Sequence, residues 1–209
     1  SADASLPLIY LTGQIKENPS TAPNFCMLLR KHIGNARILS VTQPNFERIV
    51  EMQLEHLDEM GDLCQKKLIV EIMGKHSNII FTDADGTIID SIKHISHQVS
   101  SVREVLPGRT YVYPPAQEKE NPLDIDINYF MNHVLRKPIS VTKAIYTSLT
   151  GLSPVIANEI CYRAGVDGGM STAGLSMQEQ EDLYAAFDAM RTSIKEEQFA
   201  PCIAYQGYA

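Results

Sequence analysis

Apolar and polar residues alternate along several short stretches in the first half of the chain. Between Lys67 and Met73, Leu68, Val70 and Ile72 occupy every second position, and this period of two is typical of a β-strand. The strands predicted in this way are Ser5–Leu11, Ala36–Val41, Arg48–Leu54, Lys67–Met73, Asn78–Phe81 and Thr87–Ile92. The last two flank the turn Asp83–Gly86, so we expect them to form a hairpin.

One helix interrupts these strands, and helices alone follow them. The string NFCMLLRKHIGN places Phe25, Leu28 and Leu29 on one helical face and ends at Gly34, which predicts a helix whose apolar side belongs to the core. Beyond Pro122 helical periodicity dominates, in residues 124–136, 140–149, 153–164 and 176–198. The pattern predicts an α+β protein, with a β-rich lobe at 1–115 and a helical lobe at 116–209.

The charge of the chain narrows the classes of partner. Its formal net charge is −7, which argues against indiscriminate binding of nucleic acid. Residues 25–50 differ, because they contain a single acid, Glu47. The basic residues of this stretch are Arg30, Lys31, Arg37 and Arg48. A local basic face on an acidic protein is one interpretation, and an ordinary solvated surface is the other.

The cysteines and the apolar runs point to a cytosolic protein. The four cysteines are far apart and form no C-x-x-C pair, which predicts reduced thiols and no zinc site. No apolar run approaches the ~20 residues that span a bilayer. The chain begins at Ser1 without a methionine, so we expect it to be a fragment of a longer protein.

One short string resembles an enzyme signature. The sequence Asp83-Ala84-Asp85-Gly86-Thr87 matches the first motif of haloacid-dehalogenase-like phosphatases, where two aspartates serve as nucleophile and general acid/base around Mg²⁺. Such enzymes need a parallel βαβ sheet, and nothing after Asp90 has that pattern. Turn carboxylates also bind backbone N–H groups without any chemistry. We therefore expect an antiparallel hairpin here and no metal site; His94-x-x-His97 has no third ligand nearby either.

The segment from Gly151 to Gly165 has the signals of a capped helix. Ser153 suits the N-cap, Pro154 the first helical position and Gly165 the C-cap. The apolar side is expected to comprise Val155, Ile156, Ile160, Tyr162 and Ala164. The string is similar to the helix–two-turn–helix of DNA-repair glycosylases, and residues 140–166 would form that element. It departs from them where Ser153-Pro154 replace an asparagine, and the proline removes one amide donor to a phosphate.

Taken as a whole, the chain resembles the NFACT-N domain of ribosome-quality-control proteins, many of whose bacterial members are labelled fibronectin-binding proteins. The matching segments are 18–19, 25–33 (FCMLLRKHI), 71–80, 90–96, 106–108, 114–117, 121–123 and 151–165. The resemblance implies a fold related to the glycosylase architecture. It also implies a non-enzymatic, RNA-directed function without a cofactor.

The resemblance further implies partners and a site. NFACT proteins bind large ribosomal subunits obstructed by peptidyl-tRNA and recruit alanyl-tRNA for untemplated C-terminal tailing. An acidic–arginine pair faces the anticodon arm of the tRNA, and the matching pair here is Glu47-Arg48, where the family more often has Asp-Arg. We expect this pair on an exposed rim within reach of Arg30, Lys31 and Lys75, which would attract phosphates.

An alternative from another functional class stays open at this point. The family label of fibronectin-binding protein would make the chain a surface adhesin module. The chain shows no signal-peptide pattern, but a fragment does not decide the matter. For Glu47-Arg48 itself the plain alternative is a neighbouring pair of charges on the surface of a strand.

Overall fold

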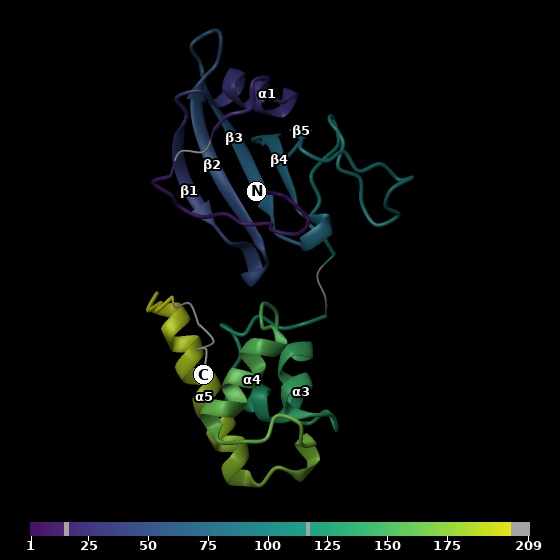
Figure 1. The fold of residues 1–209 in the computed structure, drawn as a ribbon, viewed down its shortest axis with the longest axis vertical. Helices are drawn as coiled ribbons and strands as arrows, with labels where there is room; N and C mark the ends of the chain where they lie inside the picture. The colour runs from purple at the N-terminus through teal and green to yellow at the C-terminus, as the bar shows by residue number, and fades with distance from the viewer. Residues whose placement is uncertain (15–16, 116–117, 202–209) are drawn as a thin grey trace, which may run out of the picture. The chain divides into compact units, whose positions relative to one another are not determined.

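The computed structural model describes residues 1–14, 17–115 and 118–201. The chain divides into two compact units, Ser1–Ala116 and Gln117–Ala209. The predicted lobe boundary, between residues 115 and 116, falls next to residues 116 and 117, which lie outside the described residues. The predicted α+β class is confirmed, because the first unit holds a five-stranded antiparallel sheet and the second unit is helical (Figure 1).

The sheet is a meander in which each strand pairs with the one before it. Its strands are β1 (Arg37–Thr42), β2 (Ile49–Leu57), β3 (Leu63–Glu71), β4 (Asn78–Asp83) and β5 (Ile88–Ser91), in the order β1-β2-β3-β4-β5. Ile49 of β2 lies opposite Glu71 of β3, which lies opposite Asn78 of β4. Alternate strand ends therefore meet at the same end of the sheet, so residues far apart in sequence lie together there.

Five of the six predicted strands are confirmed, and one is wrong. The apolar run Ser5–Leu11 forms no strand, and its Leu11 side chain is fully exposed. The backbone N–H of Leu8 donates to the carbonyl of Ser1 instead of to a neighbouring strand. A strand is stable only when its backbone groups meet a partner. The apolar pattern of this run did not reveal that it lacks one.

The two faces of the sheet are covered by different segments. On one face Ile49, Ile69, Ile80 and Ile88 form a core with Val105, which the irregular segment after β5 contributes. On the other face lies helix α1 (Asn24–Ile33), whose His32 ring packs 6.0 Å from the ring of Phe81. The helix is where the periodicity predicts it. Its apolar side, however, is only half-buried with no fully buried residue, so the expectation that Phe25–Leu29 belong to the core is wrong.

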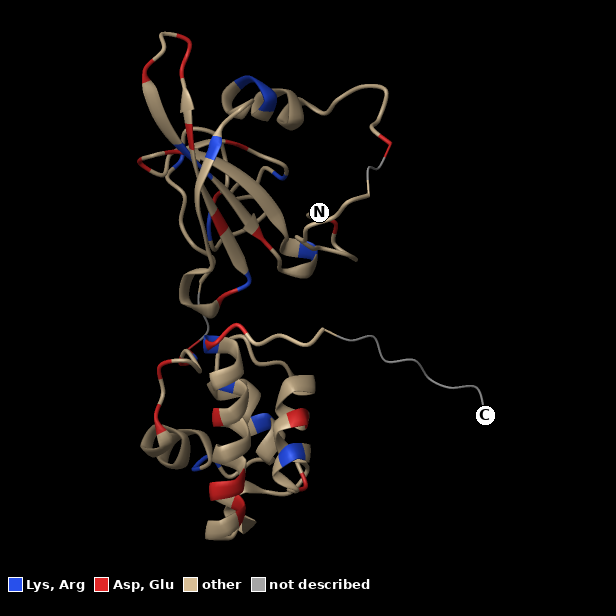
Figure 2. Ribbon diagram, turned by 90° about the vertical axis from the view of Figure 1, so that its left-hand side faces the viewer, with Lys and Arg blue, Asp and Glu red and all other residues tan. Residues whose placement is uncertain are grey.

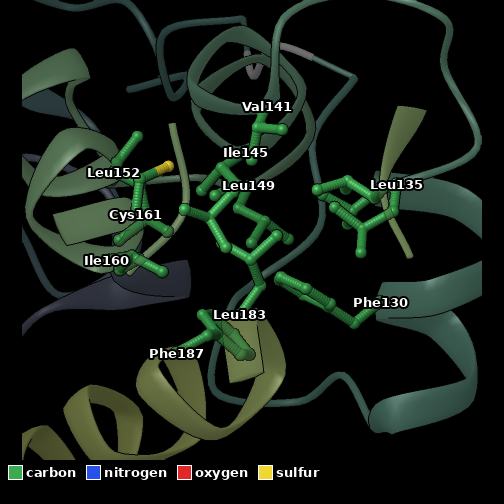
Figure 3. Close-up of a cluster of buried hydrophobic side chains, with 14 of the residues drawn as sticks. Phe130, Leu135, Val141, Ile145, Leu149, Leu152, Ile160, Cys161, Leu183 and Phe187 are labelled. Carbon is green, nitrogen blue, oxygen red and sulfur yellow. The ribbon is translucent and has the colours of Figure 1, made fainter. Parts of the chain in front are cut away.

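The second unit is built from helices around an apolar core of its own (Figure 3). Its elements are α2 (Ile127–Tyr129), which continues into a π-helix (η3, Phe130–Val134), then α3 (Val141–Ser148), α4 (Pro154–Ala164), a 3-10 turn (η4, Thr172–Gly174) and α5 (Met177–Lys195). Phe130 stacks on Phe187 of α5 with ring centroids 4.9 Å apart. The four predicted helical stretches are thus confirmed.

Helix α4 shows which sequence signals were sufficient to predict the ends of a helix and which were not sufficient to predict its buried side. The Ser153 hydroxyl accepts a hydrogen bond from the Ile156 N–H, Pro154 opens the helix, and Gly165 ends it at φ 68°, as the caps predict. Ile160 is fully buried. Val155 and Tyr162 were expected on the apolar side, but they are 74% and 82% exposed. That part of the prediction is wrong, because the buried side of the helix turns toward Ala157 and Cys161 instead.

No helix within the described residues is both long enough and apolar enough to cross a bilayer.

Candidate functional site

The pair Glu47-Arg48 lies at the turn that leads from β1 into β2. The backbone of this turn is held by hydrogen bonds on both sides. The Glu47 carbonyl accepts from Nε2 of Gln43 at 2.8 Å, and the Arg48 carbonyl accepts from the N–H of Ile72 at 2.8 Å. The side chain of Arg48 is exposed, and that of Glu47 is half-buried. The fold therefore presents the guanidinium of Arg48 to solvent from a fixed backbone.

The two residues before this pair have unusual backbone angles. Asn45 has φ 52° and Phe46 has φ 57°, both in the left-handed region. Asparagine tolerates this region, but phenylalanine rarely adopts it. Such a conformation costs on the order of 1–3 kcal/mol and persists where the surroundings fix it. Both residues belong to the short 3-10 turn η1 (Pro44–Phe46), which the Glu47 N–H closes by donating to the Pro44 carbonyl at 2.9 Å.

Lys75 lies at the same end of the sheet as Arg48. It belongs to the 3-10 turn η2 (Gly74–His76), which connects β3 to β4 and begins two residues after Ile72. Gly74 has φ 56°, and the Met73 N–H donates to the Ser77 hydroxyl at 2.8 Å. Lys75 itself is exposed. The hydrogen bond between Arg48 and Ile72 thus brings together two of the five predicted site positions that are far apart in sequence.

Arg30 and Lys31 do not lie with them. The ammonium of Lys31 forms an ion pair with Glu59 at 3.4 Å, and Glu59 belongs to the hairpin loop that joins β2 to β3. The nine residues of β2 separate that loop from Arg48, a distance of roughly 30 Å at about 3.3 Å per residue. The expectation that both cations flank the Glu47-Arg48 pair is wrong, because α1 ends at the opposite end of the sheet.

Beneath the site lies a buried ionic network that was not predicted as part of it. Glu71, opposite Ile49 in the ladder, is fully buried. Its carboxylate accepts from both terminal nitrogens of Arg103, at 2.8 and 2.5 Å, and from the Tyr111 hydroxyl at 2.9 Å. Burial, together with the charge of Glu71, raises the pKa of Tyr111. The one sign of this network in the sequence was Glu71 itself, an acid at a core position of an apolar strand, because a buried carboxylate needs partners.

This network fastens the segment after β5 onto the sheet, and Tyr111 is the place to test it. Tyr111→Phe removes one hydrogen bond to a buried carboxylate, so we expect the free energy of unfolding to fall by about 1–3 kcal/mol. Chemical denaturation followed by circular dichroism measures the change. Tyr113→Phe is the matched control, because Tyr113 is 46% exposed and donates to the less buried Glu51. Equal losses in the two variants would contradict a special contribution of the network.

The Asp83–Gly86 string forms the predicted antiparallel hairpin. Oδ1 of Asp83 accepts from the Thr87 N–H at 2.8 Å, and Gly86 has φ 86°, as such a turn requires. Asp85 is exposed. Within the described residues no three histidine, cysteine, aspartate or glutamate side chains are grouped so that they could hold a metal ion. The carboxylate of Asp83 therefore has a structural role in the turn.

The histidines of the string His94-x-x-His97 have separate partners. Nε2 of His94 lies 2.6 Å from Oδ1 of Asp90, whereas Nε2 of His97 lies 3.5 Å from Oε2 of Glu104. Cys26, Cys64 and Cys161 are free thiols, and Cys202 lies outside the described residues. The two histidines are thus engaged with different carboxylates.

A cavity of about 950 Å³ lies elsewhere in the first unit, between α1, the first residues of the chain and the sheet. Leu29 of α1, together with Leu68 and Val70 of β3, gives it an apolar lining. Asp90 and His94 border it, but they bind each other. Neither Glu47 nor Arg48 lines this cavity, so it is separate from the site of that pair.

Comparison with known proteins places this geometry in a family context. The family model described as NFACT N-terminal and middle domains matches residues 1–208. The Rqc2 homolog RqcH of Bacillus subtilis is 39% identical over 204 residues, which is 97% of this chain and 34% of that protein. The archaeal Rqc2 homolog aRqcH of Methanocaldococcus jannaschii is 32% identical over 186 residues, which is 85% of this chain and 25% of that protein. The chain thus spans about a third or less of the length of these relatives.

Solved structures agree with the fold. The fibrinogen binding protein from Staphylococcus aureus has a TM-score of 0.77 and 30% identity, with 93% of this chain and 65% of that chain covered. The N-terminal part of the fibronectin/fibrinogen-binding protein from Streptococcus suis has a TM-score of 0.74 and 33% identity, with 90% and 66% covered.

Proposed function

The chain belongs to the NFACT family of ribosome-quality-control proteins, and from this premise we propose that it is the RNA-directed part of a factor acting on obstructed large ribosomal subunits. In this proposal the protein binds a subunit that still carries peptidyl-tRNA. It then admits alanyl-tRNA, so that the stalled chain receives an untemplated C-terminal tail. The factor works in the cytoplasm. It acts there as a non-enzymatic adaptor, because recognition of RNA requires no cofactor and no reacting side chain.

The observation that carries this proposal is the exposed Arg48 on a fixed turn beside Glu47. A guanidinium is planar and has several donors in a fork, so it can stack on an unpaired loop base or bind its edge. The carboxylate of Glu47 can accept from the exocyclic amine of the same base. Lys75, at the same end of the sheet, supplies attraction to phosphate. Together these groups suit the loop of an anticodon arm.

Glu47 bears on which tRNA is selected. Its side chain is one methylene longer than the aspartate usual in the family, which moves the carboxylate by roughly 1.5 Å. Glu47 is also half-buried, and the hydrogen bond from Gln43 to its carbonyl fixes its backbone. The acidic side chain of the pair thus reaches one methylene further than the common form, and we propose that the pair still accepts alanyl-tRNA.

The proposal is tested by what the full-length protein carries from its own cells. We expect affinity purification to recover large ribosomal subunits together with tRNA, and sequencing of that RNA to show enrichment of alanine tRNA over total cellular tRNA. Sucrose-gradient sedimentation measures the association with the subunit. Recovery of neither subunits nor tRNA would overturn the proposal.

A second candidate function is adhesion to matrix proteins. It is favoured by one observation, that similar solved structures are described as fibrinogen- or fibronectin-binding proteins. The discriminating measurement is a direct binding assay with immobilised fibronectin, with the purified protein tested in parallel for tRNA binding. Saturable binding to fibronectin without binding to tRNA would favour adhesion.

A further inference from the structure

Charge is separated between the two ends of the sheet. The antiparallel order brings the start of β2, the β3–β4 turn and the residues after β5 to one end. The loops that join β2 to β3 and β4 to β5 lie at the other end. We call the first of these the basic rim, defined by Arg48, Lys75, His76 and Lys93. Figure 2 shows acidic residues gathered at the tip of the β2–β3 hairpin, at the opposite end.

At the acidic end two of the cations form ion pairs with acids. Lys31 pairs with Glu59 at 3.4 Å, and Arg37 pairs with Glu55 at 2.7 Å. The remaining acids of the two loops there are Asp58, Asp62, Asp83 and Asp85. At the basic rim the situation is reversed, since among the described residues no carboxylate forms an ion pair with Arg48, Lys75 or Lys93.

Lys93 is held in place by a buried amide. The side chain of Asn78, which is fully buried, donates to the carbonyl of Lys93 at 2.9 Å and accepts from its N–H at 3.0 Å. The Ser91 hydroxyl donates to the same carbonyl at 2.9 Å. Three hydrogen bonds thus fix the backbone from which this lysine extends. Like Arg48, Lys93 therefore extends from a fixed backbone.

The ammonium of Lys93 reaches across the rim. It donates to the carbonyl of Ala2 at 3.0 Å and to the carbonyl of Lys75 at 3.5 Å. An ammonium has three donors, so one N–H remains for a further acceptor. The hydrogen bond to the Lys75 carbonyl also places this charge over the turn that carries the Lys75 side chain. A second lysine on this turn, Lys75, adds to the attraction for an anion at the rim.

Asp3 is an acid that senses the charge of Lys93 without forming an ion pair with it. The pKa of Asp3 is lowered, chiefly by a hydrogen bond from the Ser5 hydroxyl and least by the charge of Lys93. The Asp3 carboxylate also accepts from the Ser5 N–H at 2.8 Å. The Ser5 hydroxyl and the Leu6 N–H also donate to Oδ1 of Asp3, and the described ion pairs include none between Asp3 and Lys93.

We propose that Lys93 and Lys75 bind the phosphodiester backbone of a structured RNA at the basic rim, with Asn78 as the residue that positions Lys93. This inference rests on the proposed function and adds to it a residue outside the Glu47-Arg48 pair. Lys93 binds phosphate and carries no sequence information, whereas Arg48 reads a base. Within the rim, Lys93 and Lys75 therefore hold the RNA in register while the Glu47-Arg48 pair selects it.

The test compares Lys93→Gln in the full-length protein with the wild type on two probes, a deacylated tRNA and an unrelated RNA hairpin. One lost phosphate contact reduces affinity by about eightfold at 0.1 M salt, since affinity follows salt with a slope of about −0.9 per contact. We expect this loss on both probes, together with a salt slope that is shallower by about one unit. Lys93→Arg should retain the wild-type affinity and slope. Lys31→Gln, at the acidic end, is the matched control and should change neither.

Each other outcome overturns the inference. An unchanged affinity and salt slope in Lys93→Gln would show that Lys93 is not part of the interface. An equal loss of affinity in Lys31→Gln would show the same. A loss confined to one probe would make Lys93 a base-reading residue instead. A failure of the proposed function has a different signature. In that case Arg48→Ala leaves tRNA selection unchanged, whatever Lys93→Gln does to the binding of RNA in general.

Discussion

Arg48→Ala in the full-length protein is expected to abolish C-terminal alanine tailing and to leave the fold intact. The side chain of Arg48 is exposed, and its backbone is held by a bond to Ile72 that alanine retains. The variant therefore loses the guanidinium and no packing. A good bidentate base contact is worth about 1–3 kcal/mol of discrimination, which corresponds to roughly a 5- to 150-fold loss of preference for the cognate tRNA.

The measurement is tailing of a stalled reporter in cells, with tRNA selection measured in parallel on purified protein. Glu47→Ala should have the same effect on tailing, because the carboxylate and the guanidinium address one base. Arg48→Lys keeps the charge but not the planar fork, so it should retain general RNA affinity and lose selection. Tailing that persists in both alanine variants would show that this pair is not the site.

The second large effect is expected in the helical unit. Ile160 is fully buried in the core around Leu183 and Phe187 (Figure 3). Removal of such a side chain costs about 2–5 kcal/mol, and a carboxylate without a partner in an apolar core adds several more. This total approaches or exceeds the whole stability of a small domain. Ile160→Asp should therefore unfold the helical unit.

Differential scanning calorimetry and helical circular dichroism measure this outcome. Tyr162→Asp is the matched control on the same helix, because Tyr162 is 82% exposed and an exposed substitution changes stability by about 0.5 kcal/mol or less. A cooperative transition of wild-type size in Ile160→Asp would contradict the packing described for α4. Loss of the helical transition in the control variant would do the same.

The sequence predicted those elements whose signals are local. The caps of α4 depend on three residues near its ends, Ser153, Pro154 and Gly165, and all three are as predicted. The hairpin around Asp83–Gly86 likewise follows from its turn residues. The strand predicted at Ser5–Leu11 is absent because a strand also needs a partner strand, and no local pattern encodes one. The buried side of α4 was partly missed because its register depends on the helices packed against it.

The candidate site shows the same limit. The resemblance supplied Glu47-Arg48, and the structure places Lys75 at the same end of the sheet. Placing Lys31 there was wrong, because charge in the sequence does not reveal which end of the sheet a helix approaches. Lys93 was missed for a related reason, since its place at the rim depends on the Asn78 side chain across the β4–β5 connection.

The meander order of the sheet has a consequence for the kinetics of folding. Every strand pairs with its immediate predecessor, so the ladders close short loops, and such contacts form early and rapidly. The bond between Arg103 and Glu71 joins positions 32 residues apart and closes a longer loop. We infer that it forms after the transition state, as the segment following β5 settles on the finished sheet. An interaction of that kind slows unfolding and hardly changes the folding rate. The ionic network therefore prolongs the lifetime of the native sheet.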